Sequence, residues 1–392
     1  MNPDAYTRTF SFTATLAGAP LTVVSKAGLS GGASVGDVAT LAATLITPAP
    51  TETVLLLGCG HGAIGVAFAR RLTNGHLTLH DPSLVALQLT ERTLAANHFT
   101  GVTVSAQVSQ LPAGAGTFDR VIILAPQSRA LGRRWLAEAH ALLRFGGLLN
   151  LAGANGGGVQ SLIADAAALF GAAPVLGYGR GCRVAEATCR ETSPEVPAWA
   201  IIPGIAPNTW HTLRAELPGG AVELVSLPGI FSYDRLDAGT ALLLAQLGPC
   251  QGLRVLDAGC GYGPLGIAAA RLGAAHVAML DVSLLAVAAA HENIARLRLS
   301  NVAAEPSDAL ATVAGRRYDL VLSNPPFHAG KAVDTAVAEA FIAQARSLLE
   351  PDGRLLLVAN RFLPYERHLA PWFSRVTVLA QSKAYRVLNG EV

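Results

Sequence analysis

The sequence predicts an α/β protein made of two tandem domains, each built on a doubly wound, Rossmann-like sheet. Three observations lead to this fold class. The chain has 392 residues, which is too long for one ordinary hydrophobic core. It repeats itself at a spacing of about 200 residues. Within each half, short apolar runs alternate with helical stretches, and this alternation indicates parallel strands joined by right-handed crossovers.

The internal repeat is clearest around two glycine-rich turns. The aligned pairs of segments are VLLLGCGHGAIGVAFARRL (54–72) with VLDAGCGYGPLGIAAARLG (255–273), LHDPSLVAL (79–87) with MLDVSLLAV (279–287), and FDRVIIL (118–124) with YDLVLSN (318–324). A period this long indicates a duplicated domain, since solenoid repeats are about 20–50 residues long. We expect a first domain at 1–190, a proline-rich linker at 191–203 and a second domain at 204–392.

The elements of the second half follow from apolar runs of strand length and from longer stretches of helical period. In chain order we expect strand Arg254–Asp257, helix Pro264–Leu272, strand His276–Asp281, helix Ser283–Leu297, strands Val302–Pro306 and Tyr318–Ser323, helix Val333–Leu349 and strand Arg354–Val358. Ligands of doubly wound sheets bind beyond the carboxyl ends of the strands. The glycine turn and the polar residues after each strand should therefore share one crevice.

The turn DAGCGYGPLG (257–266) ends one strand and opens the next helix. Gly259 and Gly261 let the backbone approach a ligand closely, and Pro264 suits the first turn of a helix. The dinucleotide fingerprint Gly-x-Gly-x-x-Gly would need glycine at 264, where this chain has proline. Asp257 would repel a pyrophosphate and suits a cationic ligand. These features favour S-adenosylmethionine, which carries an ammonium and a sulfonium.

Two further acids stand at successive strand ends. Asp281 is placed to accept the two ribose hydroxyls, as acids at this position do in nucleotide-binding folds. Asp308, after the third strand, could accept the adenine amino group. Taken alone, each acid could equally be a solvated loop residue or a helix cap. Together they predict a cofactor site.

The corner SNPPFH (323–328) directly follows a predicted buried strand. Asn-Pro and Pro-Pro are common in ordinary turns, but here the motif resembles that of class I methyltransferases acting on exocyclic or amide nitrogens. The resemblance implies that the side-chain oxygen of Asn324 and the carbonyl of Pro325 bind the two hydrogens of an amino group. It also implies that Phe327 stacks on the base, a contact expected to contribute roughly 1–3 kcal/mol.

The resemblance narrows when three segments are taken together. LPGIFSYDRLDAGTALLLAQL (227–247), SNPPFH and VANRFLPY (358–365) are similar to those of bacterial ribosomal RNA guanine-N2 methyltransferases of the RsmC/RlmG type. FLPY followed by KAYRVL (383–388) favours the member that acts on 16S rRNA. In this family Asp237 would lie beside the methionine end of the cofactor, although it could equally be a plain helix N-cap.

The first half departs from this pattern at the chemical positions. Leu57 stands in place of Asp257, Val108 in place of Asp308, and LAPQ (124–127) in place of NPPF, while Asp81 is kept. We therefore predict a degenerate copy that does not transfer methyl groups. It is also the basic half: residues 1–190 hold 13 Lys and Arg against 9 Asp and Glu, whereas 191–392 hold 16 against 18.

The basic excess suggests that the first half positions an RNA substrate. Arg129, Arg133 and Arg134 cluster in sequence, and such a cluster is typical of phosphate binding, although it could equally be an ordinary solvated surface. The sequence shows no membrane-spanning run of roughly 20 apolar residues and no signal peptide. An odd count of five unclustered cysteines argues against a disulfide framework and a metal site, and favours the cytoplasm.

The resemblance and the site residues together predict a monomeric enzyme that uses S-adenosylmethionine to methylate the N2 amine of a guanine in 16S ribosomal RNA. The RNA partner would be either naked rRNA or the small ribosomal subunit. Three alternatives remain open on the sequence. They are the same reaction on 23S rRNA, methylation of adenine N6 or of a protein glutamine, and a non-catalytic RNA-binding or assembly factor.

Overall fold

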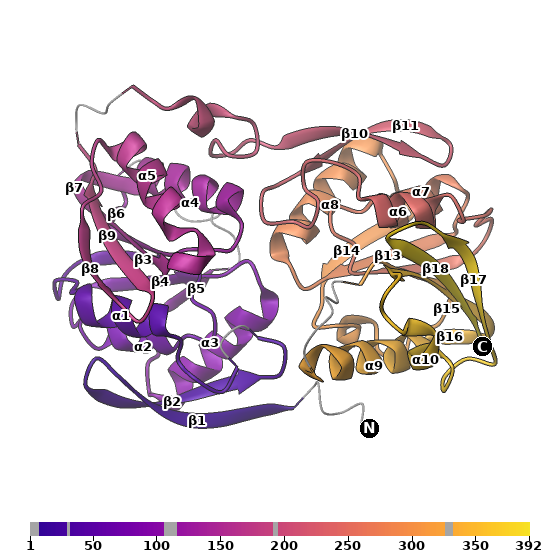
Figure 1. Ribbon diagram of the computed structural model, residues 1–392, viewed down its shortest axis with the longest axis horizontal. Coiled ribbons are helices and arrows are strands. Elements are labelled where there is room, and N and C mark those ends of the chain that lie inside the picture. The colour runs from indigo at the N-terminus through magenta and orange to yellow at the C-terminus, as the bar shows by residue number, and fades with distance from the viewer. Residues whose placement is uncertain (1–7, 30–31, 106–115, 191–194, 326–331) are drawn as a thin grey trace. The chain divides into compact units, whose positions relative to one another are not determined.

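The computed structural model describes residues 8–29, 32–105, 116–190, 195–325 and 332–392, except for the side chains of 332–337. Its contacts divide the chain into two compact units, Thr9–Trp210 and His211–Val392 (Figure 1). The candidate site lies in the second unit.

The second unit is a seven-stranded sheet with helices on both faces (Figure 1). Its elements are β10 (His211–Leu217), β11 (Gly220–Ser226), α6 (Ala238–Leu244), β12 (Arg254–Ala258), α7 (Pro264–Arg271), β13 (His276–Asp281), α8 (Leu284–Leu297), β14 (Val302–Pro306), β15 (Tyr318–Ser323), α9 (Ala332–Ser347), β16 (Leu349–Asn360), α10 (Tyr365–Leu369), β17 (Arg375–Gln381) and β18 (Tyr385–Glu391). The strand order is β14-β13-β12-β15-β16-β18-β17, and the first five strands are parallel.

Central strands β12 and β15 carry apolar side chains on both faces, as expected for a sheet that is covered on both sides. Leu256, Val321 and Leu355 pack with Phe341 and Ile342 of α9 in one buried cluster. The order of the strands brings the ends of β12 and β15 to the middle of the sheet. The sequence predicted the bounds of β12 to β15, α7 and α8 to within one residue, whereas β16 begins at Leu349, five residues before the predicted Arg354.

One edge of the sheet holds two strands that were not predicted from the sequence. β18 pairs antiparallel with both β16 and β17. Only Ser382–Ala384 separate β17 from β18, and so short a connection can join only antiparallel neighbours, since a parallel pair needs a long crossover. The sheet is therefore mixed.

The first unit repeats this topology. Its elements are β1 (Thr9–Leu16), β2 (Ala19–Lys26), α1 (Asp37–Leu45), β3 (Thr53–Leu57), α2 (Ala63–Ala69), β4 (His76–His80), α3 (Leu84–Ala96), β5 (Thr103–Ser105), β6 (Phe118–Leu124), α4 (Arg129–Leu142), β7 (Leu143–Ala154), α5 (Val159–Phe170), β8 (Val175–Gly179) and β9 (Cys182–Thr188). The strand order β5-β4-β3-β6-β7-β9-β8 is the same as in the second unit, which confirms the predicted duplication.

An antiparallel hairpin precedes the sheet in each unit and is fastened to a helix by side-chain hydrogen bonds, which in the first unit include one from Val24 N to Thr93 Oγ1 of α3 at 3.0 Å. In the second unit the fully buried Asn293 of α8 accepts from Val225 N at 2.7 Å and donates to the carbonyls of Val225 and Tyr262, both at 2.9 Å. Asn97 plays the same part for Thr22 in the first unit. These bonds tie the hairpin β10–β11, α8 and the glycine turn together.

None of the helices in the described parts of the chain combines the length and the apolar character needed to cross a bilayer.

Candidate functional site

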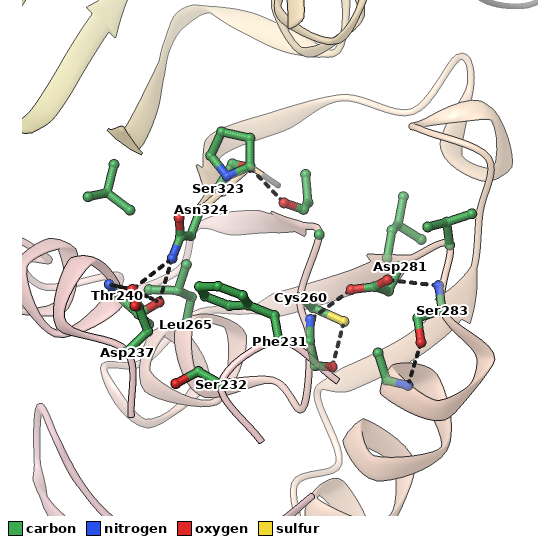
Figure 2. Close-up of a pocket in the computed structure, with 18 of the residues that line it drawn as sticks. Phe231, Ser232, Asp237, Thr240, Cys260, Leu265, Asp281, Ser283, Ser323 and Asn324 are labelled. Carbon is green, nitrogen blue, oxygen red and sulfur yellow. Dashed lines mark hydrogen bonds between the residues drawn. The ribbon is translucent and has the colours of Figure 1, made fainter. Parts of the chain in front are cut away.

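A cavity of about 420 Å³ opens at the carboxyl edge of the sheet in the second unit. The ends of four parallel strands contribute to its lining: Gly259 follows β12, Asp281 ends β13, Asn324 follows β15 and Asn360 ends β16. Asp237, at the start of α6, closes another side. Figure 2 shows Asn324 and Asp237 near one end of the pocket and Asp281 near the other. The predicted crevice therefore exists.

The glycine turn forms the floor between β12 and α7. Gly259, Gly261 and Gly263 all have positive φ, at 76°, 57° and 94°, which side chains rarely tolerate. Gly263 precedes the helix and Pro264 occupies its first turn. A β-carbon at Gly266 would lie 2.5 Å from Met279 Sδ, so glycine there lets α7 pack closely on β13.

Asp281 lies at the rim of this turn. One of its carboxylate oxygens accepts from Gly261 N and the other from Ser283 N, both at 2.8 Å. Ser283 in turn caps α8 by accepting from Ala286 N at 3.3 Å (Figure 2). Burial raises the pKa of Asp281, and the backbone hydrogen bonds oppose that effect. Each oxygen keeps further acceptor capacity for a ligand hydroxyl.

Asp257 is buried behind the turn and is not among the residues that line the cavity. Its Oδ2 accepts from Gly266 N at 2.7 Å, while its Oδ1 has no hydrogen-bond partner among the described residues. Burial raises the pKa of this carboxyl to about 7, and the nearby charge of Asp281 adds to the effect. Contact between Asp257 and a ligand ammonium remains a prediction.

Asn324 has a defined amide orientation. Its Nδ2 donates to Asp237 Oδ2 at 3.1 Å and to Thr240 Oγ1 at 2.9 Å (Figure 2). A carboxylate only accepts hydrogen bonds, so the amide nitrogen must face Asp237 and the amide oxygen must point elsewhere. Asp237 is also the N-cap of α6, accepting from Thr240 N at 2.9 Å. The carboxylate of Asp237 therefore caps α6 and also lies beside the site, so the two roles considered for this residue do not exclude each other.

Two predicted residues are less directly placed. Asp308 lies between Ser307 and Ala309, which line the cavity, but is not itself part of the lining. Phe327 lies outside the described residues, and its stacking role stays a prediction.

Several lining residues were not predicted. Thr240 shares the hydrogen bonds of Asn324, Tyr385 comes from β18, and Phe231 stands in the cavity with 58% of its surface exposed. Figure 2 shows the Phe231 ring between Asn324 and Cys260. The charge of Asp237, which lies near Tyr385, raises the pKa of that phenol. All three lie in segments that carry the family resemblance, Phe231 and Thr240 in 227–247 and Tyr385 in KAYRVL, but the sequence predicted no role for any of them.

Comparisons with known proteins agree with this geometry. The model of the methyltransferase small domain matches the chain twice, at 20–184 and 221–389. The ribosomal RNA small subunit methyltransferase C of Chromohalobacter salexigens is 38% identical over 276 residues, covering 68% of this chain and 76% of the relative. Its counterpart in Pseudomonas aeruginosa strain LESB58 is 35% identical, covering 70% and 79%. The chain belongs to the ribosomal RNA small subunit methyltransferase C family.

A solved structure matches the full length of the chain. It is the 16S rRNA N2 methyltransferase RsmC of T. thermophilus in complex with AdoMet and guanosine, with 27% identity, a TM-score of 0.78 and complete coverage of both chains. The two-domain α/β fold predicted from the sequence is therefore confirmed as that of the methyltransferase C family.

The first of the two methyltransferase small domains keeps the aspartate that accepts hydrogen bonds from the glycine turn. Asp81 accepts from Gly60 N and Ser83 N, both at 3.0 Å, as Asp281 does from its two partners. The space beside the first glycine differs. A β-carbon at Gly58 would lie 3.1 Å from Leu124 O and 3.5 Å from the Trp135 ring, whereas one at Gly259 would meet no atom of the described residues within 4 Å.

The filling of this space has a backbone cause. Ala125 N donates to Ala152 O at 2.7 Å and continues the pairing of β6 with β7, whereas Pro325 has no N–H to donate. Leu124 and the buried Trp135 thus fill the space beside Gly58 in the first unit, and no described residue does so beside Gly259 in the second. Val108, in place of Asp308, lies outside the described residues.

The arginine cluster of the first unit is not the free cationic patch that was predicted. Arg134 is buried, pairs with Glu138 at 2.9 Å and donates to the carbonyls of Gly204 and Thr209. Arg129 and Arg133 both bind the carboxylate of Asp165, at 2.8 and 2.9 Å. Helix periodicity explains the arrangement: Arg129 and Arg133 are four residues apart and share the face of α4 that meets Asp165, whereas Arg134 points to another side.

Proposed function

We propose that the second unit transfers a methyl group from S-adenosylmethionine to the exocyclic N2 amine of a guanine in 16S ribosomal RNA. The observation that carries the proposal is the locked amide of Asn324. Its nitrogen is held by Asp237 and Thr240, which leaves its oxygen as an acceptor at the cavity. An amino group presented there can be bound by one of its hydrogens.

The cavity fits S-adenosylmethionine. No described residue lies within 4 Å of a β-carbon placed at Gly259, which leaves room for a ligand against the turn, and Asp281 keeps acceptor capacity for ribose hydroxyls. Asp237 and Asp281 line the cavity, and Asp257 lies behind it. Because acidic side chains surround the cavity, it suits a ligand that carries positive charge. When bound, the cofactor supplies an electrophilic methyl group on a sulfonium. Ser307 and Ala309 bring the segment of Asp308 to the same cavity, and an adenine contact for Asp308 remains part of the proposal.

The protein's part in the chemistry is alignment. The guanine amine is a weak nucleophile because its lone pair is delocalised into the ring. Asn324 Oδ1 and the Pro325 carbonyl, acting on its two hydrogens, would favour a tetrahedral nitrogen with its lone pair directed at the methyl group. The methylated amine is acidic and loses its proton without a strong base. Proline at 325 fixes φ and removes a competing donor.

The family supports the choice of RNA. The curated relatives are named as small-subunit rRNA methyltransferases, and the T. thermophilus structure is a 16S rRNA N2 enzyme bound to guanosine. We extend this substrate to the present chain, and with it a cytoplasmic location. A monomeric state is part of the same proposal.

The direct test replaces Asn324 with alanine. Asn324→Ala should lower methyl transfer to 16S rRNA by about a hundredfold or more, a cost typical of removing an aligned hydrogen-bonding group from a reacting centre. Its affinity for S-adenosylmethionine, measured by calorimetry, should stay nearly unchanged because the residue addresses the base. Turnover above a tenth of the wild-type value would contradict the role of Asn324.

A swap of the two partners tests the amide lock itself. Asp237→Asn keeps an N-cap of equal quality but no longer forces the orientation of Asn324, and we expect turnover to fall roughly tenfold or more. Asn324→Asp alone brings two carboxylates together. The double variant Asp237→Asn with Asn324→Asp again places one amide donor against one carboxylate. Its turnover should return to within about tenfold of the wild-type value. A double variant no better than either single would exclude the lock. A raised Kd for the cofactor in Asp237→Asn would instead assign Asp237 to cofactor binding.

A further inference from the structure

Two turns that are far apart in the sequence meet beside the cavity. The first follows β16 at Asn360–Pro364, and the second joins β17 to β18 at Ser382–Ala384. Asn360 pairs with Tyr385 across the sheet, and Arg361 N donates to Ala384 O at 2.7 Å. Asn360, Leu363 and Tyr385 line the cavity. The motifs NRFLPY and KAYRVL, which the reaction does not use, therefore form one rim.

The tip of the first turn presents an aromatic ring to solvent. Phe362 is 83% exposed although its backbone is fixed. Its N–H donates to Asn360 Oδ1 at 3.1 Å, and Leu363 N donates to Asn360 O at 3.0 Å. The second turn is held by Ser382, whose Oγ accepts from Ala384 N and Tyr385 N at 3.3 and 3.0 Å. A large apolar face held in water by an ordered turn is available for stacking.

The same rim carries cations that no acid neutralises. Arg361 and Lys383 are exposed and form no ion pair with the described residues. The neighbouring Arg386, by contrast, pairs with Glu366 at 2.5 Å. These two free charges stand out because residues 191–392 hold 16 basic against 18 acidic side chains. An exposed ring with unpaired cations is the combination that binds single-stranded nucleic acid, the ring taking a base and the cations taking phosphates.

We propose that this rim, Arg361, Phe362 and Lys383, binds the RNA strand next to the target guanine, with Phe362 stacked on a flanking base. The proposal rests on the proposed function, since it assumes that the guanine enters the cavity lined by Asn360 and Leu363. A protein partner fits less well, because the exposed ring stands beside two exposed cations that form no ion pair with the described residues, a combination that suits bases and phosphates.

The test measures binding of the full-length protein to a short, fluorescently labelled single-stranded RNA that contains one guanine. Phe362→Ala should weaken binding by about five- to a hundredfold, the range expected for one lost stacking contact, and Phe362→Leu should lose nearly as much because it has no π face. Phe362→Trp should bind at least as well as wild type. The matched control is Phe145→Ala, which removes an exposed ring (66%) from the first unit and should change nothing. Equal affinity of Phe362→Ala and wild type would overturn the proposal.

Abasic substitutions identify the stacked position. An abasic nucleotide at the flanking position should weaken RNA binding by wild type and have no effect on binding by Phe362→Ala. Equal losses of affinity in both proteins at every position would exclude stacking.

The charges of the rim are tested by the salt dependence of binding. The double variant Arg361→Ala with Lys383→Ala should reduce the slope of log affinity against log salt concentration by roughly 0.7 per lost contact. Arg298→Gly is the charge control, since Arg298 is exposed with φ of 53° at the far end of α8. These are binding measurements, so they remain decisive if methyl transfer itself is not detected.

Discussion

Asp257 illustrates how one buried residue shapes the site. Its carboxyl is fully buried, its pKa is raised from 3.8 to about 7, and one oxygen accepts only from Gly266 N. Between these two pH values the folded protein keeps a proton that the unfolded chain has released. The folded state therefore binds more protons, and the free energy of unfolding falls as the pH rises from about 4 to about 7.

We predict that Asp257→Asn removes this pH dependence. Between pH 4 and pH 7 the free energy of unfolding of wild type should fall by on the order of 1–4 kcal/mol relative to that of the variant. Above pH 7 the difference between the two proteins should stay constant. Urea unfolding of a fragment spanning His211–Val392 would measure the loss, because Trp372 is the sole tryptophan in that range and its fluorescence reports on this unit. A stability difference that does not vary with pH would show that Asp257 is ionised throughout.

The glycine turns are the elements at which the site of the second unit can be compared with the closed counterpart in the first unit. Both turns have three glycines at positive φ, and both present an aspartate that accepts two backbone hydrogen bonds. They differ in what lies beyond the first glycine, where Trp135 of α4 closes the first unit. Similar glycine turns thus have different surroundings, because β6 continues its pairing with β7 through Ala125 N, whereas the residue after Asn324 is a proline without an N–H.

This contrast predicts one cofactor per chain. Calorimetric titration with S-adenosylmethionine should give a stoichiometry near one, which Asp281→Ala should abolish and Asp81→Ala should leave unchanged. Asp81→Ala is a matched control, because it removes the same two backbone contacts from the closed cradle. Two equivalent sites, or loss of binding in Asp81→Ala, would show that the first unit is not degenerate.

At this scale the sequence predicted the parallel part of the sheet well, because period and glycine turns are local signals. The antiparallel pair β17–β18 was not predicted, since its strands lack a distinctive pattern and their pairing depends on the edge left by β16. The sequence predicted those site residues that stand at the carboxyl ends of strands. Thr240 and Tyr385 were missed because only the folded chain brings α6 and β18 to Asn324. Burial of Arg134 could not be read from charge spacing.

At the scale of the whole molecule, the question is what a closed domain contributes to an RNA enzyme. The basic excess lies in residues 1–190, but the structure removes its most obvious patch, since two of those arginines share Asp165 and the third is buried. Long-range attraction depends on net charge and survives such local pairing. We therefore propose that the first unit raises the local concentration of RNA near the second without reading its sequence.

This role predicts the behaviour of the isolated second unit. A fragment His211–Val392 contains a complete seven-stranded sheet and its own hairpin, fastened by Asn293, so it should fold. It should bind S-adenosylmethionine with nearly wild-type affinity, because the glycine turn, Asp281 and Asp257 all lie within it.

Methylation of 16S rRNA by this fragment should fall steeply, mainly through a raised KM, while its response to added salt should be weaker than that of the full chain. Both effects follow because fewer cations meet the phosphates. Circular dichroism and cofactor binding are the controls that separate this outcome from misfolding. If the fragment is folded and methylates RNA as well as the full chain does, electrostatic recruitment by the first unit is excluded. If it aggregates, the first unit is needed for stability, and the charge excess has a different origin.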